Sequence, residues 1–259
     1  MRDRFLGASL LALFAGASTG AFADANDWAG FNLGINLGYS FAASHSQTTT
    51  VAVPGGYFAS SSIPAINTAG SQHLNPEGFI GGGQAGYSYA VDPNWVVGLE
   101  ADLEANSITD RESRSAVYPC CAPSSFAIGS KVESTWLATL RPVIGYAMDN
   151  WMVYITGGLA LHDQKASFAF TDDFAAASAN GGFSTTRGTW TVGGGFQHKI
   201  DRDWSWRVEY LYVDYGRVSG SSANLATGTP VVSFAQNPFT QTASLNGNVV
   251  RVGVNYRFD

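Results

Sequence analysis

The sequence predicts an all-β protein, an eight-stranded antiparallel up-and-down transmembrane β-barrel with short periplasmic turns and four long extracellular loops. Three observations support this fold class. Eight segments alternate bulky apolar residues with small or polar ones, their connections alternate between short and long, and only 13% of the 259 residues are charged. A period of two indicates strands with two different faces. Soluble domains usually contain about 25% charged residues, so much of this surface is not expected to face water.

The first 23 residues have the features of a secretory signal peptide. A basic start precedes a short apolar run, and residues 21–23 read Ala-Phe-Ala, the form of a cleavage site. We therefore predict a cleaved signal peptide over residues 1–23 and a single barrel domain over residues 24–259, with a retained anchor as the alternative. Removal of two arginines and one aspartate takes the net charge from −6 to −7, which argues against a nucleic-acid partner.

Each predicted strand places bulky apolar residues at alternate positions. The first alternates over fourteen residues, which exceeds the usual strand length of about 5–6 residues in soluble proteins. The predicted strands are Trp28–Phe41, Phe79–Val91, Trp95–Ser107, Val132–Met148, Trp151–His162, Thr189–Ile200, Trp204–Tyr215 and Asn248–Phe258.

The connections between these strands fall into two classes. Tight turns at residues 92–94, 149–150 and 201–203 alternate with long segments rich in small and hydroxyl residues. Short turns at one end and long loops at the other are typical of outer-membrane barrels. The predicted extracellular loops are 42–77, 108–131, 163–188 and 216–247.

Tryptophans gather beside the tight turns. An indole ring can lie in lipid while its N–H reaches the headgroups, which makes tryptophan common at membrane interfaces. We therefore predict an aromatic girdle at the periplasmic interface, made of Trp28, Trp95, Trp151, Trp204 and Trp206.

Glycines occupy one face of the predicted strands. Gly81-x-Gly83-x-x-Gly86 has the spacing of a dinucleotide-binding fingerprint, but that motif requires a following helix, and the turn at residues 92–94 leaves no room for one. The interior of an eight-stranded barrel is just wide enough for side chains. The face with the small residues is therefore predicted to line the lumen, and the bulky face is predicted to contact lipid.

Charged residues of both signs lie on the predicted lumen face. Unpaired charges there would be costly, whereas mixed signs permit pairing. We expect a salt-bridge network that blocks the lumen. Paired carboxylates for acid–base catalysis are the alternative, but neighbouring arginines favour ionised carboxylates, and a blocked lumen offers a substrate no access. The predicted network is Glu100, Asp102, Glu104, Arg141, Arg207, Glu209 and Arg251.

The cysteines and histidines indicate neither a disulfide framework nor a metal or cofactor site. Cys120 and Cys121 are adjacent, and neighbouring cysteines rarely pair because the resulting ring is strained. His45 and His73 lie in the predicted first loop, where haem binding through either one is an open possibility. Enzymes that modify lipid A need a nucleophile system; His162, predicted to point inward, and His198, predicted to face lipid, complete no triad.

The strand sequences resemble those of the small outer-membrane immunogenic and opacity-type proteins of Gram-negative bacteria, relatives of the OmpA-like transmembrane barrel. The resemblance rests on the stretches WAGFNLGINLGY (28–39), GGGQAGYSY (81–89), WVVGLEADLE (95–104), WLATLRPVIGYAMDNWMVYITGGLA (136–160), WTVGGGFQHKIDRDWSWRVEYLYVDYG (190–216) and VVRVGVNYRF (249–258). It covers nearly every predicted strand and none of the long loops.

The resemblance implies an integral protein of the Gram-negative outer membrane. It also implies that the barrel-assembly machinery reads the final strand, with Tyr256 and Phe258 as the signal, although Asp259 follows Phe258. Pro142 lies where such proteins more often have glycine, so a bulge or a lost ladder bond is expected there. Proteins of this kind act as envelope-stabilising proteins, antigens and adhesins; some are called porins, and a few bind haem.

We therefore expect a structural or surface-interaction protein that is not an enzyme. The alternatives are a narrow porin-like channel for ions or very small solutes and, less favoured, an outer-membrane lipid-modifying enzyme. The expected partners are outer-membrane lipid and lipopolysaccharide, the barrel-assembly machinery and an unidentified extracellular partner of the loops.

Overall fold

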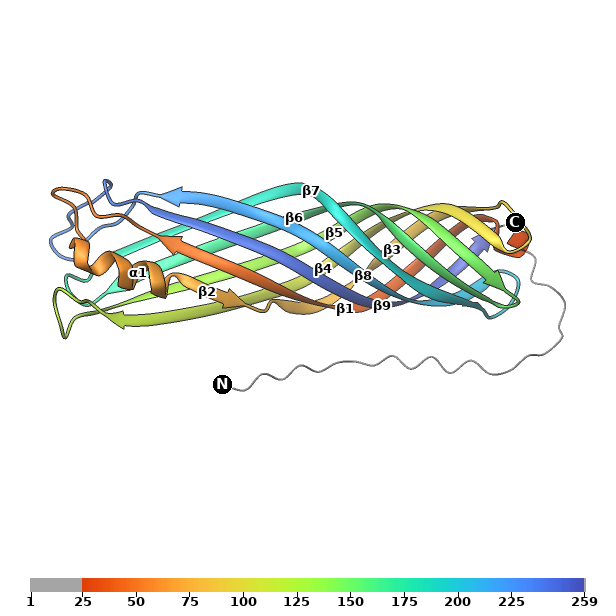
Figure 1. Cartoon of the computed structure of the whole chain (residues 1–259), viewed down its shortest axis with the longest axis horizontal. Helices are drawn as coiled ribbons and strands as arrows, with labels where there is room; N and C mark the ends of the chain where they lie inside the picture. The colour runs from red at the N-terminus through yellow and green to blue at the C-terminus, as the bar shows by residue number, and fades with distance from the viewer. Residues whose placement is uncertain (1–24, 259) are drawn as a thin grey trace.

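The computed structural model describes residues 25–258, and the predicted signal peptide and Asp259 lie outside them. The described chain forms one antiparallel sheet that closes into a long barrel (Figure 1). Apart from one short strand, consecutive strands are neighbours around the ring, and the last strand pairs back with the first from Phe31↔Phe258 to Thr49↔Thr240. The predicted ring of eight strands is confirmed, with one short additional strand beside it.

The secondary structure consists of the strands β1–β9, the short α-helix α1 and two 3₁₀ turns, η1 and η2. No helix within residues 25–258 is long and apolar enough to span a membrane. In chain order the elements are η1 Ala25–Trp28, β1 Gly30–Thr49, η2 Ser60–Ser62, α1 Ile63–Ala69, β2 Ser71–Leu74, β3 Glu77–Ala90, β4 Trp95–Val117, β5 Ser125–Met148, β6 Trp151–Asp172, β7 Ser178–Lys199, β8 Trp204–Ser222 and β9 Phe239–Phe258.

Most of the segments predicted as extracellular loops are strands, which corrects the sequence-based boundaries. β4 and β5 pair as far as Val117↔Ser125, so most of the predicted loop 108–131 belongs to the barrel wall. Periodicity missed this region because both of its faces are largely polar. On β1, for example, buried Ser44, Ser46 and Thr48 alternate with exposed polar residues.

The first predicted loop, 42–77, holds α1 and β2. β2 pairs with the outer part of β1, from Ser44↔Leu74 to Gln47↔Ser71. It occupies the place that β3 leaves when β3 begins at Glu77. Figure 1 shows α1 and β2 at the end of the barrel opposite the C-terminus.

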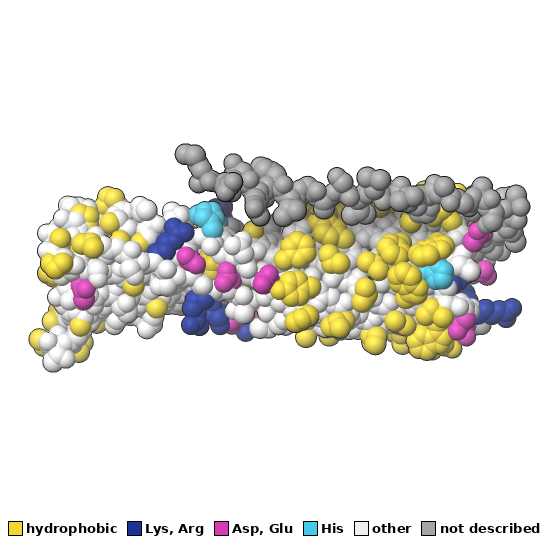
Figure 2. Space-filling model, turned by 90° about the horizontal axis from the view of Figure 1, so that it is seen from below, with side chains coloured by type: hydrophobic (Ala, Val, Ile, Leu, Met, Phe, Trp, Pro, Cys, Tyr) yellow, Lys and Arg dark blue, Asp and Glu magenta, His cyan; other side chains and the backbone are white. Residues whose placement is uncertain are grey.

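The outer surface separates into an apolar part and a charged part. Figure 2 shows hydrophobic side chains gathered on the part of the barrel nearer the tight turns, followed by a group of charged side chains. Ile35, Leu103 and Ile155 are 71%, 66% and 67% exposed. Exposed aliphatic residues at alternate positions along a long strand are the pattern of a lipid-facing barrel wall.

Pro142 interrupts pairing without shifting the strands. The register of β5 with β6 is the same before and after it, at Leu140↔Leu159 and Val143↔Thr156, while the intervening positions are unpaired. The missing proline N–H explains the loss of pairing. The expected loss of ladder pairing at Pro142 is confirmed. The register of β5 against β6 shifts elsewhere, between Glu133 and Leu137.

Candidate functional site: the filled lumen

The seven charged residues predicted to share the lumen all lie inside the barrel. Each is at most 8% exposed. β4 supplies three of them at alternate positions, because side chains two residues apart along a strand point to the same face. The cluster consists of Glu100, Asp102 and Glu104 from β4, Arg141 from β5, Arg207 and Glu209 from β8, and Arg251 from β9.

Arg141 joins two sides of the wall. Its Nη2 lies 2.7 Å from Glu100 Oε1 and 2.8 Å from Asp102 Oδ2, and its Nη1 lies 3.1 Å from Glu209 Oε1. Thr139 donates a hydrogen bond of 2.7 Å to the same oxygen of Asp102. One guanidinium therefore contacts three carboxylates from two strands that are not neighbours.

Arg251 makes a second bridge across the lumen. Its Nη1 donates to Glu104 Oε1 at 2.6 Å, its Nε donates to Glu209 Oε2 at 2.7 Å, and its Nη2 lies 2.8 Å from Asp102 Oδ1. The planar, multi-donor guanidinium suits such contacts better than a lysine ammonium would.

Arg207 extends the network toward the periplasmic end. It donates to Glu100 Oε2 at 2.5 Å and also to Gln84 Oε1. Gln84 accepts a hydrogen bond of 3.1 Å from Asn36 and donates one to Asn255. The link between these three amides and the charges was not predicted from the sequence.

Small residues on the lumen face leave space for these long side chains. A Cβ on Gly38 would lie 2.6 Å from Arg251 Cβ, and a Cβ on Gly195 would lie 2.8 Å from the Tyr154 hydroxyl. That hydroxyl donates to Glu209 Oε1 at 3.1 Å. Larger residues at these two glycines would therefore displace members of the network.

The network has three arginines and four carboxylates. Burial of single charges in a protein interior is costly, whereas paired and hydrogen-bonded charges can be accommodated. Most of the carboxylate oxygens are occupied by guanidinium or hydroxyl donors. Chemically, this arrangement fills and cross-links the lumen, because its carboxylates are bound to arginines.

Trp28 is not part of the girdle, which corrects the sequence-based assignment. It lies inside the periplasmic end of the barrel and is 7% exposed. The Lys199 ammonium lies 4.6 Å above its ring and 3.5 Å from Asp27. The alternation that began at Trp28 was misleading because η1 precedes the strand, which starts at Gly30.

The other four tryptophans of the predicted girdle lie on the outer surface near the tight turns. Trp95, Trp151 and Trp204 are 46%, 42% and 46% exposed, and Trp206 packs against Trp151 with 5.8 Å between ring centroids.

The two aromatic residues at the end of β9 join this outer aromatic surface. Tyr256 packs against Trp204 with 5.1 Å between ring centroids. Phe258 is 43% exposed and packs against Phe31, with 5.7 Å between ring centroids.

A second cluster, missed in the sequence, fills the extracellular end of the barrel. Phe58, from the segment that leads into α1, packs edge-on against Phe170 and Phe239, at centroid distances of 5.5 and 5.8 Å. We call this cluster of aromatic and aliphatic residues the outer plug; its buried members are Phe58, Ile66, Ala69, Tyr118, Phe126, Ile128, Phe168, Phe170, Ala177, Ala179, Leu225 and Phe239. The alternation of Phe168 and Phe170 in a predicted loop was the available signal.

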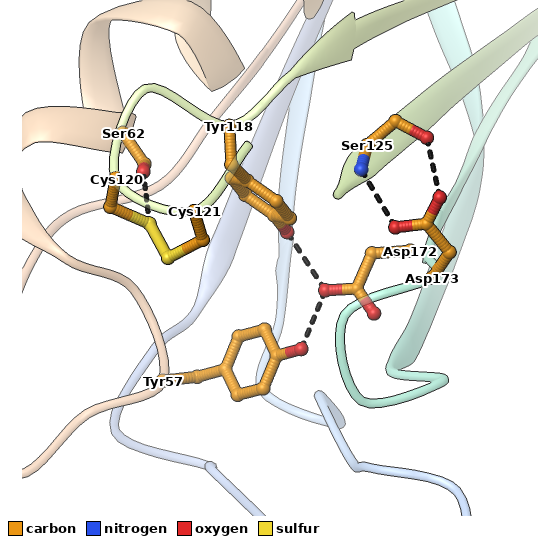
Figure 3. Close-up of a disulfide and its surroundings, with 8 residues drawn as sticks. All are labelled: Tyr57, Ser62, Tyr118, Cys120, Cys121, Ser125, Asp172 and Asp173. Carbon is orange, nitrogen blue, oxygen red and sulfur yellow. Dashed lines mark hydrogen bonds between the residues drawn. A yellow bond between two sulfur atoms is a disulfide. The ribbon is translucent and has the colours of Figure 1, made fainter. Parts of the chain in front are cut away.

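Asp172, the last residue of β6, links the end of this strand to the segment after β1 and to the turn after β4 (Figure 3). Its Oδ2 accepts hydrogen bonds from Tyr57 at 2.5 Å and Tyr118 at 2.9 Å. Burial and the adjacent carboxylate raise the pKa of Tyr57 and Tyr118 above the ordinary 10.0. Nearby, hydrogen bonds from the Ser125 amide and hydroxyl lower the pKa of the Asp173 carboxyl.

Cys120 and Cys121 form a disulfide with each other, which corrects the expectation that adjacent cysteines would not pair. The tight turn after β4 brings the two sulfurs together despite the strained ring. The Ser62 hydroxyl donates to Cys120 Sγ at 3.3 Å, so the turn also touches the segment before α1 (Figure 3).

Two of the four histidines lie apart from the others. His162 is buried against Tyr215, with 4.7 Å between ring centroids, and His198 packs on Trp151 at 4.2 Å. His45 and His73 lie on β1 and β2, which corrects their assignment to a loop. Residues 25–258 contain no group of three or more His, Cys, Asp or Glu residues arranged to hold a metal ion.

Comparison with known families identifies the barrel. Residues 9–258 match the model of the family described as the outer membrane protein beta-barrel domain. The chain belongs to this outer-membrane β-barrel family. The chain is 33% identical over 248 residues to the 31 kDa outer-membrane immunogenic protein of Brucella melitensis biotype 1, across 93% of this chain and 88% of that protein. The family match and this similarity place the protein in the outer membrane.

The chain also has more distant similarities. The 25 kDa outer-membrane immunogenic protein of Brucella abortus biovar 1 is 26% identical, across 89% of this chain and 79% of that protein. Among solved structures, OprG from Pseudomonas aeruginosa has a TM-score of 0.41 and 11% identity, across 89% of this chain and 96% of that one. The protease OmpT from Escherichia coli has a TM-score of 0.45 and 9% identity, across 88% and 97%. Scores this low carry no inference about activity.

Proposed function

We propose that this outer-membrane β-barrel is a non-conducting structural protein that displays its extracellular end to surface partners. The observation that carries the proposal is the network of Arg141, Arg207 and Arg251 with four carboxylates inside an eight-stranded ring. The interior of an eight-stranded ring is just wide enough for side chains to fill it. With the network in place, we expect no continuous aqueous path along the barrel axis.

The outer plug supports the same proposal independently. Phe58, Phe170 and Phe239 pack together across the extracellular end, and Tyr57 and Tyr118 are tied to Asp172 beside them. Packed aromatic side chains exclude water. Solutes would therefore meet two barriers of different chemistry along the barrel axis.

Conductance in planar bilayers tests the proposal against a narrow channel. We expect silent bilayers for the wild type and for Arg141→Gln and Arg251→Gln, because the outer plug still closes the barrel. The matched control is Arg202→Gln, which removes a charge from an exposed periplasmic turn. Steady ion conductance by the wild type, or conductance that appears in Arg141→Gln or Arg251→Gln but not in the control, would favour the channel.

An enzymatic role is not part of the proposal. His162 faces the ring of Tyr215, and its Nδ1 lies 3.4 Å from the Asp163 carbonyl oxygen. His198 packs between Trp151 and Trp206 near the periplasmic end. Neither contact resembles a nucleophile and base. Release of fatty acid or sugar products from lipid A by the purified protein would contradict this view.

We propose that basic residues on the outer surface contact lipopolysaccharide. Arg111 on β4 lies directly opposite Lys131 on β5, and like charges in such a pair normally repel. Lys165 on β6 lies opposite Glu133, which also pairs with Lys131. Lys165 lies four residues beyond exposed Leu161, about 10 Å above the apolar surface at a usual strand rise and tilt. Phosphate groups of lipopolysaccharide would relieve the repulsion there.

Retention of lipopolysaccharide during detergent extraction tests this contact. We expect the double variant Lys131→Gln, Lys165→Gln to retain less lipopolysaccharide than the wild type, because two phosphate-binding cations are gone. Arg202→Gln removes one charge at the opposite end and should retain the wild-type amount. Equal retention by all three proteins would remove the phosphate contact from the proposal.

The last strand is proposed as the element recognised by the barrel-assembly machinery. Phe258 and Tyr256 present aromatic rings at the outer surface of β9, next to Phe31 and Trp204. Phe258→Ala should lower the amount of heat-modifiable protein in the outer membrane, whereas Phe79→Ala, at another exposed aromatic position, should not. Normal membrane levels of Phe258→Ala would argue against this role.

A further inference from the structure

Two imidazole rings lie side by side on the outside of the barrel. His45 on β1 is directly opposite His73 on β2 in the antiparallel pairing. Their ring centroids are 4.6 Å apart, and both residues are exposed. Cross-strand partners point to the same face of a sheet, so both rings are open to the solvent from one side.

The backbone beneath the two rings is held firmly. The neighbours of His45, Ser44 and Ser46, are 4% and 0% exposed, and those of His73, Gln72 and Leu74, are 0% and 1% exposed. A ligand pair on rigid strands loses little freedom when it binds an ion.

Gln72 anchors β2 from the inside. Its Nε2 donates to the Ala69 carbonyl oxygen at 3.0 Å and to the Ile128 carbonyl oxygen at 2.7 Å. These bonds tie β2 to the end of α1 and to β5, across the interior. The position of His73 beside His45 is therefore set by the wall of the barrel and not by a loose loop.

The chemistry of this pair suits a divalent transition metal ion. Imidazole nitrogen is a common ligand of Zn²⁺, Cu²⁺ and Ni²⁺, and Cu²⁺ is bound most tightly of the three. Two rings on one side of an ion occupy adjacent coordination positions. Because residues 25–258 provide no third His, Cys, Asp or Glu at this place, water would fill the remaining positions.

The same geometry does not suit a haem held by both histidines. Two axial imidazoles lie on opposite faces of a porphyrin. His45 and His73 pack against each other at 4.6 Å, which leaves no space for a porphyrin between them.

We propose that His45 and His73 form an exposed binding site for one divalent transition metal ion, with Cu²⁺ preferred over Zn²⁺. The site lies on the extracellular part of the wall, beyond the lipid-facing surface, so the ion would come from the medium. It is independent of the lumen network and of the proposed structural role.

Cu²⁺ binding by untagged protein in detergent micelles tests the site, with titration calorimetry for affinity and electron paramagnetic resonance for the ligands. We expect one Cu²⁺ per chain, with two nitrogen ligands in the spectrum. His45→Asn and His73→Asn should each weaken binding at least about tenfold, because each removes one of two protein ligands. Zn²⁺ should compete for the same site at higher concentration.

His198→Asn is the matched control, because His198 lies on the outer surface at the opposite end of the barrel. It should bind Cu²⁺ as the wild type does. All variants should retain the gel shift between unheated and boiled samples, which reports a closed barrel. Wild-type protein that binds no Cu²⁺, or single variants of His45 and His73 that bind it unchanged, would overturn the site.

Discussion

Arg141 on β5 and Glu209 on β8 form an ion pair across the lumen, with 3.1 Å between Nη1 and Oε1, although β6 and β7 separate their strands in the sheet. Such a contact is possible only because the ring is narrow enough for opposite walls to meet. The lumen network therefore joins opposite sides of the barrel wall in addition to filling the interior.

Removal of Arg141 should destabilise the barrel strongly. Arg141→Met removes one guanidinium from Glu100, Asp102 and Glu209, and breaking a buried ion pair typically costs about 3–5 kcal/mol. Urea unfolding in detergent micelles, followed by the fluorescence of the outer tryptophans, measures the loss. Arg202→Met, in an exposed turn, should change the unfolding free energy by less than about 0.5 kcal/mol. A similar small effect for Arg141→Met would show that the network contributes little to stability.

The four carboxylates of the network should not be equivalent. Asp102 is contacted by Arg141, Arg251 and Thr139, whereas within residues 25–258 Glu104 forms an ion pair with Arg251 alone. Because carboxylates outnumber arginines by one, Glu104→Gln removes the surplus charge.

We expect Glu104→Gln to cost about 1 kcal/mol or less, and Asp102→Asn to cost about 3 kcal/mol, because the latter takes a buried carboxylate partner from both Arg141 and Arg251. Unfolding midpoints of the two variants, measured side by side, give the comparison. Equal losses, or a larger loss for Glu104→Gln, would contradict the assigned contacts.

Tyr118 should resist ionisation while the outer plug is folded. Its pKa is raised above the ordinary 10.0 by burial and by Asp172. A raised folded-state pKa stabilises the fold fully below the unfolded value, and this contribution declines as the pH rises above it.

Phenolate absorbance measures this directly. Between neutral pH and about pH 11, just above the ordinary tyrosine pKa, folded Tyr118→Phe should gain as much absorbance as the wild type. When both proteins are unfolded in urea, the wild type should gain more phenolate absorbance than Tyr118→Phe, because its Tyr118 then ionises. A smaller gain in the folded variant would place Tyr118 in contact with solvent.

The disulfide between Cys120 and Cys121 should contribute little to stability. A disulfide stabilises mainly by closing a long loop in the unfolded chain, and a bond between adjacent residues closes almost none. Replacement of both cysteines by serine should change the unfolding free energy by less than about 1 kcal/mol. A loss of several kcal/mol would mean that the turn itself supports the outer plug.

The parts predicted well are those where the two faces of a strand differ in chemistry. Ile35 and Leu103 alternate with small or charged residues, and their outward orientation followed from that contrast. Glu100, Asp102 and Glu104 could be assigned to the lumen by the same parity. Their exact partners could not, because the distance across the barrel depends on strand tilt and register.

The parts predicted poorly lack that contrast. Ser46 and Thr48 on β1 line the interior, yet the residues between them are also polar, so periodicity ended too early. Trp28 sits beside a tight turn in space but belongs to η1, inside the barrel. The meeting of His45 with His73 depends on β2, a strand of four residues, too short to produce a periodic signal.

By itself the sequence determined the class of protein, the eight lipid-facing segments and the residues that must share the lumen. The reason is that hydrocarbon and a narrow interior impose opposite demands on alternate positions of every strand. The tertiary structure alone decided which charges pair, how the outer plug closes the extracellular end and which histidines meet. Those contacts join residues far apart in the chain, and only the closure and register of the barrel bring them within reach.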